Sequence, residues 1–306
     1  MRPQHHHVNA FYVIALTLAL TLYAGCAGGA SGGSEQVNDY RFGSQALELR
    51  FHSTNPTVFR SGDTLTLLVD VYNRGTSDVT DGDLYLTGFD PTILENMLID
   101  PPFLVKEGKD EFDPRGEFSD VYTIHGFVNG PRNSDEIAQT IQLTSCYEYS
   151  TIATAEVCVD SDPFNRKIED KVCQLQARNF GAQGHPLVVS GVEPTVSGSD
   201  IRFKITVSNS DSGTLFDPAV SNDQCAFGLD YGDIDKIYVG SVSLSNKALF
   251  CEPVNPVRLR NGQGTVVCQC ENCVDEFQNA YWAQLNMEFH YGYKNTVTTG
   301  ITVYND

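Results

Sequence analysis

Two runs of alternating apolar and polar residues, one in each half of the chain, constrain the fold most strongly. The run DTLTLLVDVY lies between Gly62 and Asn73, and the run DIRFKITVS lies between Gly198 and Asn209. The glycine and the asparagine are 11 residues apart in both copies. Because successive side chains of a strand point to opposite faces, each run predicts a β-strand with one buried face.

The correspondence between the halves extends to individual positions. The apolar positions pair as Leu65 with Ile201, Leu67 with Phe203, Val69 with Ile205, and Val71 with Val207. A second block, IQLTSCYEYSTIATAEVCV at 141–159, matches LNMEFHYGYKNTVTTGITV at 285–303, with two tyrosines in register. Two blocks repeated in one order predict related domains in tandem. Since Gly- and Asn-containing turns separate the strands, we expect an all-β chain with two Greek-key, Ig-like β-sandwiches at 40–160 and 183–306.

The first repeat resembles a known family. Its turn DVYNRGT, from Asp70 to Thr76, is similar to that of the Ig-like, cell-adhesion-related (CARDB-type) domains of prokaryotic surface proteins. The second copy, TVSNSDSG, keeps Asn209 but delays the glycine. The chain as a whole also resembles cysteine-containing exported proteins of small-genome archaea. The resemblance implies a binding or scaffolding module and no particular chemistry.

The N-terminus has the features of an export signal. Residues 11–25 carry no charge, follow Arg2, and are too few for a typical membrane-spanning helix. The end of this run, LYAGC, resembles a lipobox, so residues 1–26 are expected to be a signal peptide with lipid attachment at Cys26. Tyr23 departs from the usual leucine, which leaves ordinary cleavage and a retained anchor as alternatives. Residues 27–39 then form a Gly/Ser-rich tether.

Eight further cysteines follow Cys26. An even number of cysteines in an exported chain favours disulfides. We expect Cys158 and Cys173 to close the connector 161–182, and Cys251 to pair with Cys268 across the segment RLRNGQG. The other four are left unassigned, and Cys146 and Cys158 should point away from the core. Zinc bound by Cys251, Cys268, Cys270 and Cys273, or redox-active thiols, are the alternatives.

The charge limits the partners. There are 39 acidic and 20 basic residues, for a net charge of −19, which disfavours nucleic acid because phosphate binding needs clustered Lys and Arg. Two acidic clusters, DVTDGD at 78–83 and DYGDID at 230–235, could ligate Ca²⁺ or be solvated turns. Trp282 beside Tyr281 could form a binding patch or a contact between domains.

The sequence contains no recognised catalytic motif, and its histidines are scattered. We therefore predict a non-enzymatic cell-surface protein without cofactor or metal, held at the membrane by its N-terminal anchor. It would bind a protein or glycan partner or form part of the envelope. The rival interpretation is an exported enzyme or solute-binding lipoprotein, although a solute-binding protein should alternate strands with helices.

Overall fold

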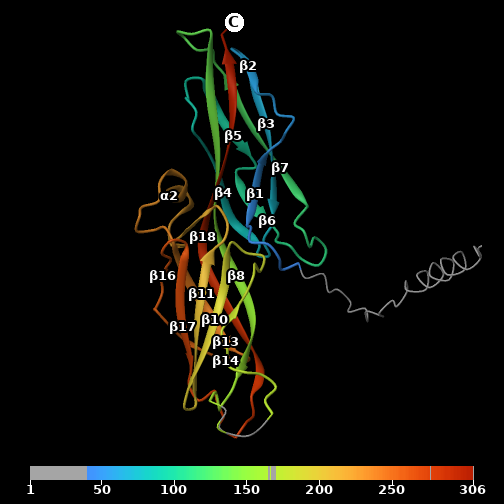
Figure 1. Ribbon diagram of the computed structural model, residues 1–306. Helices are drawn as coiled ribbons and strands as arrows, with labels where there is room; N and C mark the ends of the chain where they lie inside the picture. The colour runs from blue at the N-terminus through green and yellow to red at the C-terminus, as the bar shows by residue number, and fades with distance from the viewer. Residues whose placement is uncertain (1–39, 165, 167–169, 276, 306) are drawn as a thin grey trace, which may run out of the picture. The chain divides into compact units, whose positions relative to one another are not determined.

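The computed structural model describes residues 40–164, 166, 170–275 and 277–305, which belong to one compact unit, 39–306 (Figure 1). Almost all regular secondary structure of the described residues is β-strand, and they contain one short helix, α2 (Asn222–Phe227). No helix in the described part is long and apolar enough to cross a membrane. The strands are β1 (Leu47–Phe51), β2 (Val58–Arg60), β3 (Thr64–Asn73), β4 (Val79–Thr87), β5 (Leu94–Asp100), β6 (Phe103–Lys106), β7 (Ser119–Val128), β8 (Glu136–Val159), β9 (Arg178–Asn179), β10 (Leu187–Ser197), β11 (Asp200–Asn209), β12 (Thr214–Phe216), β13 (Lys236–Leu244), β14 (Lys247–Ala248), β15 (Phe250–Glu252), β16 (Val257–Arg258), β17 (Gln263–Cys270) and β18 (Tyr281–Tyr304).

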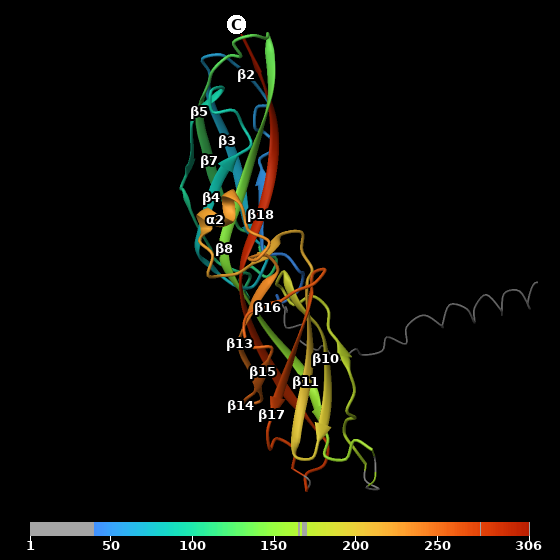
Figure 2. The same ribbon diagram turned by 90° about the vertical axis from the view of Figure 1, so that its left-hand side faces the viewer.

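The two longest strands, β8 and β18, are the centre of the fold. Each has 24 residues, and they pair antiparallel without a register shift from Val159↔Tyr281 to Glu136↔Tyr304. Figures 1 and 2 show them alongside each other in both views. They belong to a nine-stranded sheet with the order β14-β13-β18-β8-β4-β6, to which β2, β12 and β16 add short pairings.

Two smaller sheets complete the sandwich. One has the order β1-β3-β7-β5, and the other has the order β15-β17-β11-β10-β9. Their inward side chains join those of β8 and β18 in one apolar cluster. The all-β class expected from the sequence is confirmed, because burial of one face of each strand is what alternating residues favour.

The repeated strands occupy equivalent places. β3 lies between β1 and β7, and β11 lies between β10 and β17. The register brings Leu47 opposite Asn73 in the first half and Leu187 opposite Asn209 in the second. All eight inward positions predicted for β3 and β11 are fully buried, which confirms the alternation read from the sequence.

The repeat also has an approximate internal two-fold relation. Equivalent residues of β8 and β18 are Tyr147 with Tyr291 and Tyr149 with Tyr293, but the register pairs Tyr147 with Tyr293 and Tyr149 with Tyr291. The equivalent tyrosines are thus swapped in the pairing, and the pair Glu148↔Gly292 lies at the centre of this swap. Residues 294–304 of β18 therefore lie beside the beginning of β8, and each half of the chain contributes a strand next to the other half. The domain limits 40–160 and 183–306 stay predictions.

Four buried tyrosines mark this centre. The ring centroids of Tyr147 and Tyr149 lie 5.7 Å apart, and those of Tyr291 and Tyr293 lie 6.4 Å apart, both edge to face. The Tyr149 hydroxyl donates to Asn73 Oδ1 at 3.2 Å. The Tyr293 hydroxyl donates to Asp211 Oδ2 at 2.8 Å and accepts from the Gly213 N–H at 3.0 Å. Burial raises the pKa values of all four phenols above the ordinary value.

All eight cysteines in the described residues are joined in disulfides: Cys146–Cys225, Cys158–Cys173, Cys251–Cys268 and Cys270–Cys273. The second and third are the pairs expected from the sequence. Cys146 and Cys158 lie outside the main apolar cluster, as their strand parity implies. Cys146 is nevertheless fully buried, because α2 covers it from the outer side of β8.

Candidate functional site

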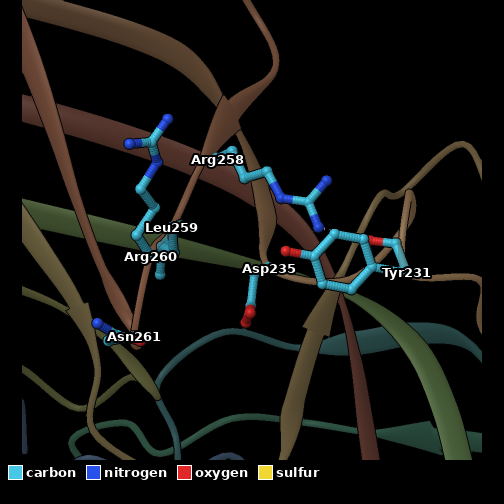
Figure 3. A pocket seen from close by; sticks show the side chains of 6 residues that line it. All are labelled: Tyr231, Asp235, Arg258, Leu259, Arg260 and Asn261. Atoms are coloured by element: carbon cyan, nitrogen blue, oxygen red, sulfur yellow. Dashed lines mark hydrogen bonds between the residues drawn. The ribbon is translucent and has the colours of Figure 1, made fainter.

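A polar hollow of about 730 Å³ lies beside the turn that joins β16 to β17, and its volume is in the range of small-molecule sites. Its lining comprises Tyr231, Asp235, Arg258, Leu259, Arg260 and Asn261 (Figure 3). Because only 20 of the 306 residues are basic, two arginines around one hollow are unusual for this chain.

Strand geometry places the two arginines. Arg258 and Arg260 are two positions apart and exposed, whereas Leu259 between them is 2% exposed and packs into the core. The chain then reverses at Asn261 and Gly262, whose φ angles of 53° and 74° suit a two-residue hairpin turn. Reciprocal backbone hydrogen bonds between Arg260 and Gln263, at 2.7 and 3.1 Å, close this turn.

Arg258 is held against an aromatic ring. Its guanidinium carbon lies 4.5 Å from the centroid of Tyr231, and the guanidinium also donates to the Tyr231 carbonyl oxygen. Tyr231 is nevertheless 81% exposed as a residue. Figure 3 shows Arg258 reaching toward this ring and Arg260 pointing away from it. Within the described part of the chain, the Arg260 guanidinium has no ion pair or hydrogen bond, so its donors face solvent.

Neighbouring carboxylates are largely engaged elsewhere. Lys236, opposite Arg258 in the strand register, lies 3.0 Å from Asp217 Oδ2 and 4.0 Å from Asp233 Oδ1. Burial acts to raise the pKa of Asp217, but hydrogen bonds from the Ala219 N–H and Lys236 outweigh it and hold the pKa below its ordinary value. Asp235 is the carboxylate that lines the hollow.

The backbone of Asp235 is fixed on both sides. Its N–H donates to the Leu215 carbonyl at 2.8 Å, and its carbonyl accepts from the Leu259 N–H at 2.7 Å. Its φ of 56° lies in the left-handed region, which Asp tolerates better than most residues. The hollow therefore combines an exposed aromatic ring, two guanidinium groups, one amide and one carboxylate on a restrained frame.

Several carboxylates of the acidic clusters named from the sequence bond to other parts of the chain. Asp78 accepts from the Gly108 N–H at 2.8 Å, and Asp83 accepts from Asn222 at 2.9 Å. In the later cluster, Asp233 accepts from Gln224 as well as facing Lys236. No group of three or more His, Cys, Asp or Glu side chains within the described ranges could hold a metal ion.

The aromatic pair near the start of β18 is only partly available. Trp282 is 37% exposed, and the Arg178 guanidinium stacks on its ring at 4.3 Å. Tyr281 packs against the core cluster. Cys26, the signal segment 1–26 and the tether 27–39 lie outside the described residues.

The histidines lie in different environments. His290 Nε2 is 3.3 Å from Glu288 Oε1, and Glu288 also accepts from Ser241 at 3.1 Å. His185 is 2% exposed; its Nε2 lies 2.8 Å from Thr76 Oγ1 and 3.4 Å from the Ile152 N–H that donates to it. Burial lowers the pKa of His185 to about 4, so this imidazole is neutral near pH 7.

The hollow was not among the sites predicted from the sequence. Its local signal was the pattern Arg258-Leu259-Arg260 directly before the Asn261-Gly262 turn, which places two cations on one side of a strand end. Tyr231 comes from a separate loop, and only the fold brings it to Arg258.

Exposed apolar side chains form a second feature of the surface. Leu98 of β5 lies opposite His125 of β7, and Phe127 is two residues after His125 on the same strand. Leu98 is 67% exposed and Phe127 is 55% exposed. They lie on the outer face of the four-stranded sheet, since the alternate residues Ile124 and Val128 are buried.

No family model matches the chain, and no curated protein matches it. Among solved structures, the chain is similar to the Salmonella enterica SafA pilin in complex with the SafB chaperone, with 10% identity over 73% of this chain and 85% of that one at a TM-score of 0.21. It is also similar to the Escherichia coli chaperone DraB, with 10% identity over 73% and 86% at 0.19. A third is the secreted serine protease VesC of Vibrio cholerae, with 9% identity over 79% and 50% at 0.20.

Proposed function

We propose that this chain is an exported, membrane-anchored cell-surface protein that binds a partner without catalysing a reaction. The observation that carries the proposal is the pairing of all eight cysteines of the described residues into disulfides. Disulfides persist in oxidising compartments outside the cytoplasm. The N-terminal pattern ending at Cys26 supports export and attachment to the membrane.

The surface supports a binding role. Exposed apolar side chains on β5 and β7, and the arginine-containing hollow, offer contact groups on a frame restrained by disulfides. Residues held on a rigid scaffold bind with a smaller loss of conformational entropy. The resemblance of Asp70–Thr76 to the turn of CARDB-type domains favours the same adhesive or scaffolding role.

Thiol labelling tests the export. The full chain isolated from its own cells should take up no alkylating reagent before reduction at the eight cysteines after Cys26, and eight equivalents after it. Free thiols in the freshly isolated protein would contradict export.

Cell fractionation tests the anchor. The wild-type chain should remain with the membranes and be cleaved by protease added to intact cells. The Cys26→Ser variant should be released into the medium or the soluble envelope fraction. Retention of the variant would contradict attachment through Cys26 and favour a retained, uncleaved N-terminal anchor.

A further inference from the structure

The geometry points to a binding site for a short acidic saccharide in the hollow lined by Tyr231, Asp235, Arg258, Arg260 and Asn261. This inference rests on the proposed binding function and names its ligand class. A guanidinium group matches the two oxygens of a carboxylate with parallel N–H donors. Arg260 can offer such donors, since no group within the described ranges pairs with it.

The other lining groups suit a sugar ring. Tyr231 presents an exposed aromatic face, on which the C–H groups of a pyranose can stack. Asp235 accepts hydrogen bonds from hydroxyl groups, and the Asn261 amide both donates and accepts them. Arg258 is already oriented by its stacking on Tyr231, so binding immobilises few additional side-chain torsions.

The same features argue against two other ligands. A peptide partner would need an apolar pocket for an anchoring side chain, but Leu259, the aliphatic member of the lining, is buried. A long polyanion would be repelled by a chain whose net charge is −19. A ligand with one or a few carboxylates and many hydroxyl groups fits best.

A titration with two matched oligosaccharides tests the inference. The full chain is titrated with a tetramer of galacturonic acid and with the methyl ester of the same tetramer. The ester keeps the ring and its hydroxyl groups but removes the charge. We expect the acid to bind at least ~10-fold more tightly than the ester, the difference expected for one charge-assisted contact. Equal affinity for acid and ester, or no binding of either, would overturn the inference.

Variants assign the binding to this hollow. Arg260→Gln should weaken binding of the acid about 10-fold, and Tyr231→Leu should weaken binding of both acid and ester. Arg178→Gln is the control, because it removes the same charge at a position that does not line the hollow. Wild-type affinity in Arg260→Gln, or equal losses in Arg260→Gln and Arg178→Gln, would contradict the site.

Two further measurements separate this inference from the proposed function. If a poly-glutamate peptide binds as tightly as the uronic acid tetramer, the saccharide assignment is wrong. If the Arg258→Gln/Arg260→Gln double variant still binds intact cells as the wild type does, the inference fails at this site while the surface-binding function stands. Loss of cell binding in the double variant, together with the acid preference, supports both.

Discussion

His185 is a buried histidine whose surroundings keep its ring uncharged. His185 has a neutral imidazole whose Nε2 accepts a hydrogen bond from the Ile152 N–H, so the proton resides on Nδ1. That Nδ1 is buried without a partner among the described residues. Burial is the main cause of the lowered pKa, and the nearby cations Lys109 and Arg41 lower it further.

We therefore expect His185 to make the fold acid-sensitive. The folded-state pKa of about 4 lies below the ordinary 6.5, so protonation favours the unfolded chain. Its contribution is complete above pH 6.5 and is lost as the pH falls toward 4, by up to about 3 kcal/mol. His185→Gln should show a smaller loss of unfolding free energy between pH 7 and pH 4.5 than the wild type in denaturant titrations. His125→Gln, at an exposed position, is the control; parallel pH profiles for all three proteins would contradict the prediction.

Removing the hydroxyl of Tyr149 or of Tyr293 should lower the unfolding free energy by different amounts. Tyr149→Phe removes a hydrogen bond to the uncharged amide of Asn73, whose Oδ1 still accepts from the Gly75 N–H, and the Ser77 N–H loses an acceptor. Tyr293→Phe removes a bond to charged Asp211 and leaves the Gly213 N–H without its acceptor. We expect losses of about 1 kcal/mol for Tyr149→Phe and about 2 kcal/mol for Tyr293→Phe in unfolding free energy. The exposed Tyr304→Phe should change it little, and the reverse order of the two buried variants would contradict this account.

Among the elements, β18 depends on close packing at one position. A Cβ at Gly292 would lie 2.2 Å from the ring of Phe216, which is 1% exposed and has no room to move aside. A Cβ at Gly300 of the same strand would meet nothing within 4 Å.

These two glycines provide a matched pair. Gly292→Ala should lower the unfolding free energy by about 1–3 kcal/mol through overpacking. Gly300→Ala should be neutral or slightly stabilising, because alanine restricts the unfolded chain more than glycine does. Chemical denaturation of both variants measures the difference, and equal effects would show that strand propensity, and not packing against Phe216, controls the result.

At the element scale, much of the fold could be predicted from the sequence. The alternation in β3 and β11 identified the buried face, because strand period and burial are local properties. The long pairing of β8 with β18 could not be predicted, since the sequence repeat says which residues are equivalent but not which are neighbours. The hollow was missed for the same reason: Tyr231 and Arg258 are distant in sequence and meet only in the folded chain.

For the whole molecule, the disulfide Cys146–Cys225 should stabilise most. Its two cysteines are 79 residues apart in the sequence, and it holds the α2 segment on β8. The cysteines of Cys270–Cys273 are only 3 residues apart. In the chain-entropy model, the longer loop contributes about 4.5 kcal/mol and the shorter about 1.6 kcal/mol. The double variant Cys146→Ala/Cys225→Ala should therefore unfold at a clearly lower denaturant concentration than Cys270→Ala/Cys273→Ala. Equal midpoints, compared at equal m-values, would contradict the loop-length explanation.

The antiparallel pairing of β8 with β18 along their whole length suggests how the two halves of the chain arose. In the nine-stranded sheet, the end of β8 pairs with the start of β18 and the end of β18 pairs with the start of β8, so each half pairs with a strand end of the other, as two subunits do when they exchange strands. A single half expressed alone would leave a long strand edge without its neighbour. Two copies of such a half could satisfy each other by the same exchange, with Glu148 and Gly292 marking the former axis between subunits. A duplicated gene whose product once dimerised would leave this arrangement after fusion into one chain.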